Sequence, residues 1–177
     1  MAAILAEARL ARIAGAEVVI VSLHAGTEYQ HAASSYQISL ARQLLASTDV
    51  DLILGAHAHV VQPLERIGDK WIAYGMGNQV AWQNQAYNTR DGIMSRFTFT
   101  EVSPGVFRVV KAEVIPTFVW LDGAPARLHD ISAVLTAPDA PAASRASCLA
   151  SLRRTQTVIG QRGAFAQGSV LIGAGAA

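Results

Sequence analysis

The sequence contains little that would cross-link the chain or attract it to a charged partner. A single cysteine, Cys148, stands among 177 residues, so an internal disulfide is excluded. Charged residues make up only 15% of the chain and the formal net charge is +1, which argues against nucleic acid or an anionic membrane as the partner. No apolar run is long enough to cross a bilayer, and Glu7, Arg9 and Arg12 interrupt the N-terminal apolar residues, so no signal peptide is predicted.

Hydrophobic residues, by contrast, make up 51% of the chain, which suits one domain or part of a larger one with a buried core. Met1 to Gly15 has the apolar spacing of a helix. Two continuous apolar runs follow, at 18–21 and 52–54, as in strands buried on both faces. Between them lies a predicted helix, and Ser34 and Gln37 have the spacing of a capping box at its start. Together these segments predict a parallel βαβ unit.

The pattern changes after this unit. A hairpin is predicted to turn at Gly68 and Asp69, and the segments around 92–102 and 106–119 alternate apolar and polar residues, as antiparallel strands do. From about residue 126 the character is helical, clearest in SRASCLASLRRTQTVI, with a final strand near the end. We therefore predict an α/β fold in which residues 1–125 form the main body and residues 126–177 form a helical tail packed on or beside it.

Three of the five histidines lie where predicted strands end. His24 follows the first buried strand, and His57 and His59 follow the second, in the stretch LILGAHAHVVQP. The carboxyl ends of parallel strands open at one edge of a sheet, so we expect these three side chains to share one pocket. Residues i and i+2 of an extended chain point to the same side, so the pair can bind one divalent metal or one each of two metals. Imidazole suits zinc, iron, manganese or nickel.

Simpler interpretations exist for each of these residues. An H-x-H pair alone is also compatible with two partly exposed histidines in ordinary hydrogen bonds. Glu28 can orient a ligand histidine through its second ring nitrogen, or it can be a solvated loop carboxylate. Asn78 can face the same cleft or simply occupy a turn. His31 is expected to be a surface histidine and His129 to be structural or solvated, and Arg153 and Arg154 are expected on a solvated helix face.

Three segments, VVIVSLHAGTEYQ, DLILGAHAHVVQPLE and WIAYGMGNQV, occur here in an order and spacing that resemble the CapA family. These are poly-γ-glutamate (capsule) synthesis proteins with a domain of the calcineurin-like metallophosphoesterase superfamily. The resemblance covers most of residues 1–120. It implies a sandwich of two sheets flanked by helices, a site for two divalent metals (Mn, Fe or Zn) that acts as a hydrolase, and a location in the cell envelope.

The resemblance also implies roles for single residues. His24 and His57 match ligands of the second metal, and His59 matches a ligand of the first. Glu28 and Asn78 match an acidic residue and an asparagine of the family's motifs. The chain departs from the family pattern at four positions: Ala25 replaces a tryptophan, Ala56 and Ala58 replace a histidine and a proline in the H-H-P-H motif, and Gln79 replaces a phenylalanine. These changes remove bulk around the site and leave the ligands in place.

The family's first half supplies an aspartate motif, a bridging carboxylate and an Asn-His motif, which have no counterpart in these residues. The expectation is therefore a C-terminal half that supplies histidines, and no catalytic residue is assigned. The substrate would be an anionic polymer or a phosphoester. Two alternatives remain: an inactive binding or scaffold module, and a mononuclear hydrolase completed by Asp51 or Glu28. A half-domain also leaves a sheet edge exposed, which predicts self-association.

Overall fold

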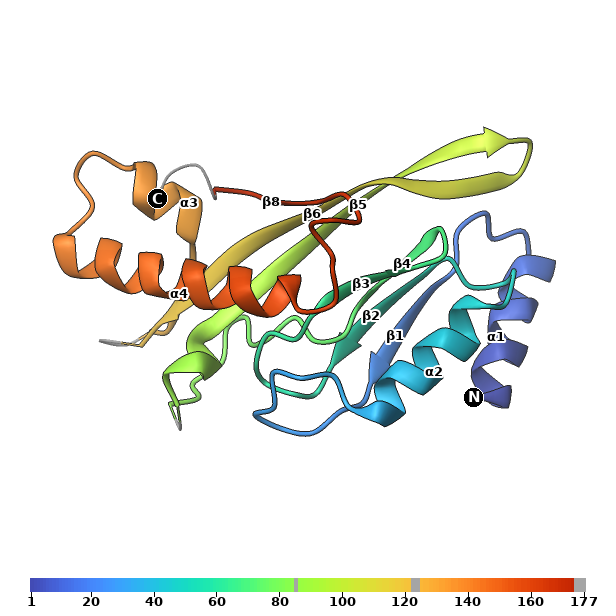
Figure 1. Ribbon diagram of the computed structural model, residues 1–177, viewed down its shortest axis with the longest axis horizontal. Helices are drawn as coiled ribbons and strands as arrows, with labels where there is room; N and C mark the ends of the chain where they lie inside the picture. The colour runs from blue at the N-terminus through green and yellow to red at the C-terminus, as the bar shows by residue number, and fades with distance from the viewer. Residues whose placement is uncertain (85, 122–124, 174–177) are drawn as a thin grey trace.

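The computed structural model describes residues 1–84, 86–121 and 125–173, and its elements fall into two four-stranded sheets (Figure 1). The first sheet is built from the first half of the chain. Its elements are α1 (Ala2–Ile13), β1 (Ile20–His24), α2 (Ser35–Leu45), β2 (Leu52–Ala56), β3 (Leu64–Ile67) and β4 (Lys70–Ala73). The strand order is β1-β2-β4-β3, with β1, β2 and β4 parallel and β3 antiparallel to β4.

Local sequence explains this sheet well. Ser34 accepts a hydrogen bond from the backbone N–H of Gln37, and the Gln37 side chain accepts one from the Ser34 backbone, so the predicted capping box starts α2. The predicted βαβ unit is confirmed by the parallel pairing of β1 and β2. The predicted hairpin is confirmed by the antiparallel pairing of β3 and β4 around Gly68 and Asp69.

The second sheet is built around a long antiparallel ribbon, β5 (Asp91–Ser103) and β6 (Val106–Trp120), which follows a short 3-10 helix, η1 (Tyr87–Arg90). In Figure 1 the free end of this ribbon projects beyond the rest of the molecule. Pro116 lies in the middle of β6, opposite Ile93 of β5. On its other edge, β6 pairs with two further strands, one through its residues 112–114 and the other through its residues 117–120. Pro116 lies between these two paired stretches.

Those two strands come from the C-terminal part of the chain. That part contains β7 (Arg127–Asp130), α3 (Ile131–Thr136), α4 (Ala142–Gly160) and β8 (Ser169–Leu171). β7 pairs antiparallel and β8 parallel with β6. The predicted helical tail is thus helical over α3 and α4, and it also contributes two short strands to the second sheet. The division of the chain at residue 125 stays a prediction.

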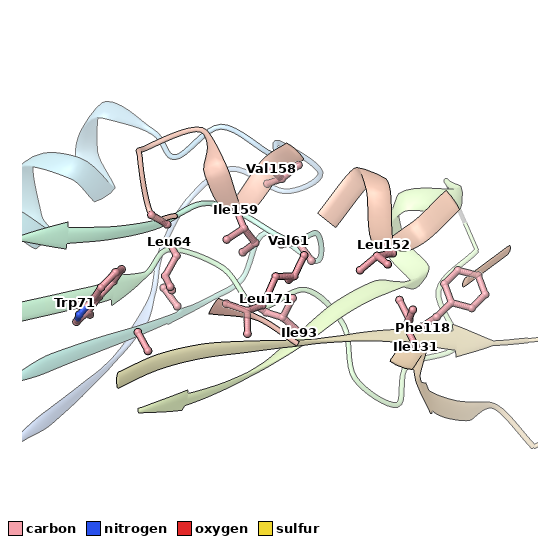
Figure 2. Close-up of a cluster of buried hydrophobic side chains, with 14 of the residues drawn as sticks. Val61, Leu64, Trp71, Ile93, Phe118, Ile131, Leu152, Val158, Ile159 and Leu171 are labelled. Carbon is pink, nitrogen blue, oxygen red and sulfur yellow. The ribbon is translucent and has the colours of Figure 1, made fainter. Parts of the chain in front are cut away.

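Two clusters of buried side chains show how the layers pack. One lies between the helices α1 and α2 and one face of the first sheet, and includes Ala8, Leu44 and Ile53. The other lies between the opposite face of the first sheet, the second sheet and α4 (Figure 2). Its members include Leu52, Val61, Leu64, Trp71, Ile93, Val114, Phe118, Leu152 and Ile159. The result is a mixed α/β arrangement, as predicted, with a mainly parallel first sheet and a mainly antiparallel second sheet. Helix α4 contributes side chains to the cluster between them.

Candidate functional site

The carboxyl ends of β1 and β2 bring two of the predicted histidines together. His24 is the last residue of β1 and pairs in register with Ala56, the last residue of β2, so His57 follows directly beside it. The ring centroids of His24 and His57 are 4.6 Å apart with the planes tilted by 47°. At this separation the two rings can approach a common ligand from adjacent strands. We call the segments 24–31 and 57–62, together with Asn78, the rim.

The backbone of the rim is unusual. His57 has φ 107°, His59 has φ 57° and Tyr29 has φ 63°, and these are the non-glycine residues with positive φ in the described part of the chain. Such conformations are sparsely populated for residues with a Cβ, and they persist only where the surroundings impose them. The expectation that His57 and His59 project to the same side of an extended strand is therefore wrong, because β2 ends at Ala56 and the chain bends beyond it.

His59 is held by Asn78. Asn78 is 7% exposed, and its Nδ2 donates hydrogen bonds to Gln83 Oε1 at 2.7 Å and to the carbonyl oxygen of Thr89 at 2.9 Å. These two donations identify Oδ1 as the acceptor for His59 Nδ1, which lies 3.0 Å away. In the neutral ring Nδ1 thus carries the proton and Nε2 carries the lone pair. This second hydrogen bond is the usual way in which proteins orient a metal-binding imidazole.

Two residues of the first loop flank His59. Glu28 Oε1 lies 3.7 Å from His59 Nε2, beyond a direct hydrogen bond, and the Glu28 side chain is 49% exposed. The Tyr29 ring stacks on the His59 ring at a centroid distance of 6.0 Å. The Tyr29 backbone N–H also donates to the carbonyl of Ala58, which ties the two loops of the rim together. Glu28 therefore lies beside the free nitrogen of His59, and its role stays a prediction.

Two buried glutamines, Gln37 of α2 and Gln62 of the rim itself, connect the two rim segments, and sequence reasoning missed this function. Gln37 is 1% exposed, and its Nε2 donates to the carbonyl oxygen of Ala25 and to Gln62 Oε1, at 3.0 and 2.8 Å. Gln62 is fully buried and donates onward to the carbonyl oxygen of Gln30 at 2.8 Å. The capping box identified Gln37 at the start of α2, but nothing in the sequence indicated that its amide also reaches the first rim loop.

Other polar residues differ from their expected settings. His31 is not a solvated loop residue, because its Nδ1 lies 2.8 Å from the carbonyl oxygen of Val61 and its Nε2 lies 3.0 Å from Asn88 Nδ2. Arg154 is not a merely solvated side chain either, since its guanidinium contacts both carboxylate oxygens of buried Asp91 at 2.8 Å. His129 belongs to β7, far along the chain from the rim, and packs edge-on against Trp120.

Asp51 does not complete the site. It precedes β2, at the opposite end of the strand from His57, and the intervening length of chain spans about 20 Å. There Asp51 accepts hydrogen bonds from Arg12 Nη2 at 2.5 Å and from the Val19 backbone N–H at 2.7 Å. The proposed completion of a mononuclear site by Asp51 is therefore wrong. A cavity of about 610 Å³ lies at this end of the sheet, between residues that include Arg12, Asp51, Lys70 and Arg108.

The residues of the rim fit a metal site in part. Two adjacent imidazoles and a third with a fixed tautomer are suitable donors for a divalent transition metal. Within the described residues, however, no group of three or more His, Cys, Asp or Glu side chains is arranged so that it could hold a metal ion by itself. Metal binding by His24, His57 and His59 thus stays a prediction, and it requires further ligands besides these three.

The fold and the rim define the class: a mixed α/β protein with a polar site at the carboxyl ends of its parallel strands. Residues 1–83 match the family described as "Bacterial capsule synthesis protein PGA_cap". The chain is 31% identical over 99 residues to "PGA biosynthesis protein CapA" of Bacillus subtilis (strain 168), and 28% identical over 99 residues to "Capsule biosynthesis protein CapA" of Bacillus anthracis. Over this first part the chain is similar to the CapA family, as its motifs predict.

The matches cover only part of this chain and only part of each relative. The aligned residues are 56% of this chain, and they are 26% and 24% of the two relatives. The chain thus matches about a quarter of the length of these relatives. None of the helices in the described ranges is both long and apolar enough to span a membrane.

Proposed function

We propose that this chain acts in the biosynthesis of a bacterial capsule or PGA, and that its rim supplies histidine ligands to a metallophosphoesterase-like hydrolytic site. The names of its relatives support the biological role. The observation that carries the chemical part is the pair of bonds that fixes Asn78 and thereby directs the free Nε2 of His59 toward Glu28. The substrate would be an anionic polymer or a phosphoester.

The residues of the chain have distinct tasks in this proposal. His24 and His57 would hold one divalent ion and His59 a second, with the remaining ligands supplied from outside these residues. A bound divalent ion lowers the pKa of a coordinated water and stabilises charge on a transferring phosphoryl group. Asn78 keeps the tautomer of His59, and Tyr29 restricts the ring by stacking on it. Ala25, Ala56 and Ala58 leave space for a ligand beside the rings.

A second candidate function is a binding module without catalysis. It is favoured by the incomplete ligand set in the described residues. In that case the rim would bind an anionic polymer or a partner chain through its exposed loop residues, and a metal would be dispensable for binding.

Titration with Co²⁺, followed by its visible absorption and by calorimetry, separates these functions. We expect saturable binding that weakens at least about tenfold in His24→Ala and His57→Ala. His129→Ala is the control, because this histidine lies in β7 and packs against Trp120. If a single ion is bound by all three rings, His24→Ala abolishes binding altogether, whereas with two positions the ion at His59 remains. Absence of saturable binding, or equal binding by all variants, would contradict the metal site and favour the binding module.

A further inference from the structure

β5 is a long strand with one unpaired side. It has 13 residues and pairs with β6 along its length, while its other side meets the rest of the chain only near its start. There the Ile93 backbone N–H donates to the carbonyl of Met76, and Gln79 Nε2 donates to the carbonyl oxygen of Ile93. Beyond Ile93, no backbone hydrogen bond from any described residue reaches this side of β5.

The contacts of Ile93 show which backbone groups are free. Both its N–H and its carbonyl point away from β6, and in an antiparallel strand this direction repeats at every second residue. The extra residue that interrupts the ladder near Phe99 lies on β6, so the alternation in β5 continues to Glu101. The residues with outward backbone groups are therefore Ser95, Phe97, Phe99 and Glu101, with one donor and one acceptor each.

Other outer strands of the two sheets are much shorter. β3 and β7 have four residues each and β8 has three. Short edges, prolines, lysines and bulges are the means by which proteins keep edges from pairing. The free part of β5, with the sequence MSRFTFTEV, contains no proline and no lysine and is rich in strand-forming residues. This edge is thus suited to accept another strand.

We propose that the free edge of β5 pairs with β5 of a second copy of this chain, antiparallel, about a two-fold axis at Thr98. Two-fold pairing of a strand with itself must place opposite residues on the same face, so their numbers sum to an even value. In the register centred on Thr98, Ser95 lies opposite Glu101 and Phe97 opposite Phe99. All four outward residues then form hydrogen-bonded pairs, and Ile93, whose groups are already used, is left outside.

Registers centred one residue away are less complete. Centring on Phe97 would place Glu101 opposite Ile93, whose backbone N–H and carbonyl already have partners. Centring on Phe99 would place Ser95 opposite Ser103, beyond the point where the β5 ladder shifts again. The register at Thr98 is therefore the one that self-pairing of this edge favours.

The side chains are compatible with this register. On the outer face Met94 lies opposite Val102, both well exposed in the single chain, at 41% and 50%. Arg96 lies opposite Thr100, so no like charges face each other. On the inner face, the Ser95 hydroxyl is buried without a hydrogen-bond partner in the described residues, and in the dimer it faces the carboxylate of Glu101 of the partner subunit.

A cysteine cross-link tests the axis directly. Opposite residues of a non-hydrogen-bonded pair have Cα atoms about 4.5 Å apart, within the range that a disulfide spans. Thr98→Cys should therefore give a covalent dimer of the whole chain under mild oxidation. Thr100→Cys is the control, because its two copies would lie about 13 Å apart. Cross-linking of both variants alike, or of neither, would overturn the proposed register.

A negative charge introduced at the same two positions tests the association without a covalent bond. Thr98 lies beside Lys111 of β6 and Thr100 beside Arg108, so a glutamate at either position has a similar neighbour in the single chain. Across the axis they differ: Thr98→Glu places two carboxylates face to face, and Thr100→Glu places one opposite Arg96 of the partner subunit. In sedimentation equilibrium we expect a concentration-dependent dimer that Thr98→Glu weakens on the order of tenfold and Thr100→Glu does not. A monomer at all concentrations would overturn the proposal.

Discussion

The two sheets of this molecule use the same chain in different ways. The first has short strands of four and five residues, with helices packed on one face and the second sheet on the other. Its strand ends carry the histidines and three strained backbone positions. The second sheet has strands of up to 15 residues, an open outer face and an unpaired edge. Close packing on both faces thus accompanies the proposed metal site, and the more open sheet carries the edge proposed to pair with a second copy.

A glycine-to-alanine change in each sheet should give the largest contrast. A Cβ at Gly55 of β2 would lie 2.0 Å from the carbonyl oxygen of Tyr74, whereas a Cβ at Gly105 in the ribbon turn meets nothing within 4 Å. We expect Gly55→Ala to lower the free energy of unfolding by about 3 kcal/mol or more. Gly105→Ala, with φ 73°, should cost about 1 kcal/mol from backbone strain alone.

Urea denaturation of both variants measures this difference. Equal destabilisation would mean that the first sheet can shift its strands as readily as the ribbon changes its turn. That result would remove the contrast between a closely packed sheet and an open one.

The buried glutamines offer a medium-sized test of the first sheet. Gln37→Leu leaves the carbonyls of Ala25 and Tyr74 without their amide donor, and we expect a loss of about 2 kcal/mol in the free energy of unfolding. Gln43→Leu, on the exposed side of the same helix, should change little. Hydrogen exchange at Tyr29, whose N–H bonds to Ala58, reports on the rim itself. Unchanged exchange at Tyr29 in Gln37→Leu would show that the glutamines do not hold the rim.

The smallest expected effect concerns the connection between the first sheet and the C-terminal segment. Glu65 of β3 accepts hydrogen bonds from the Arg162 guanidinium at 2.5 and 2.8 Å and from the Tyr74 hydroxyl at 2.7 Å. Burial raises the pKa of Glu65, but the bonds from Arg162 and Tyr74 outweigh it and leave the pKa below its ordinary value of 4.5. The carboxylate therefore stabilises the fold above that pH, and the contribution is lost as the pH falls through the lowered pKa.

Glu65→Gln should accordingly cost about 1 kcal/mol near neutral pH and progressively less in acid. Denaturation curves at a series of pH values give both quantities. Glu7→Gln, at an exposed position of α1, is the matched control. A cost of Glu65→Gln that stays constant down to acid pH would show that the charge of Glu65 is not what joins the two parts.

Much of the first sheet follows from local sequence. Continuous apolar runs, the Ser34–Gln37 capping box and the Gly68–Asp69 turn each determine a short stretch of chain, and the structure contains all three. The family resemblance also rested on residues of this part. What local sequence does not encode is the direction of a side chain beyond a strand end. His57 and His59 have positive φ in loops that are fixed by bonds between residues remote in sequence, from His59 to Asn78 and from Gln62 to Gln30.

The sequence predicts the antiparallel ribbon of the second sheet. It does not predict every strand that pairs with this ribbon. Alternation in 91–103 and 106–120 indicates a half-buried ribbon, which is observed. The strand β7, at 127–130, is too short for a periodic signal and is not predicted. A final strand near the end is predicted and is observed as β8, but its pairing with β6 is not predicted, because that partner is remote in sequence. Likewise, Arg154 gave no sign of its bond to Asp91, because a charged helix residue has the same pattern whether it is solvated or paired.

Pro116 illustrates how a residue normally excluded from an inner strand can be the suitable one. Its position opposite Ile93 directs its backbone nitrogen toward the interval between β8 and β7, where neither strand provides an acceptor in register. Any other amino acid would bury an orphan amide hydrogen in that interval. Proline has none, so β6 can change neighbours halfway along one edge without a vacant donor.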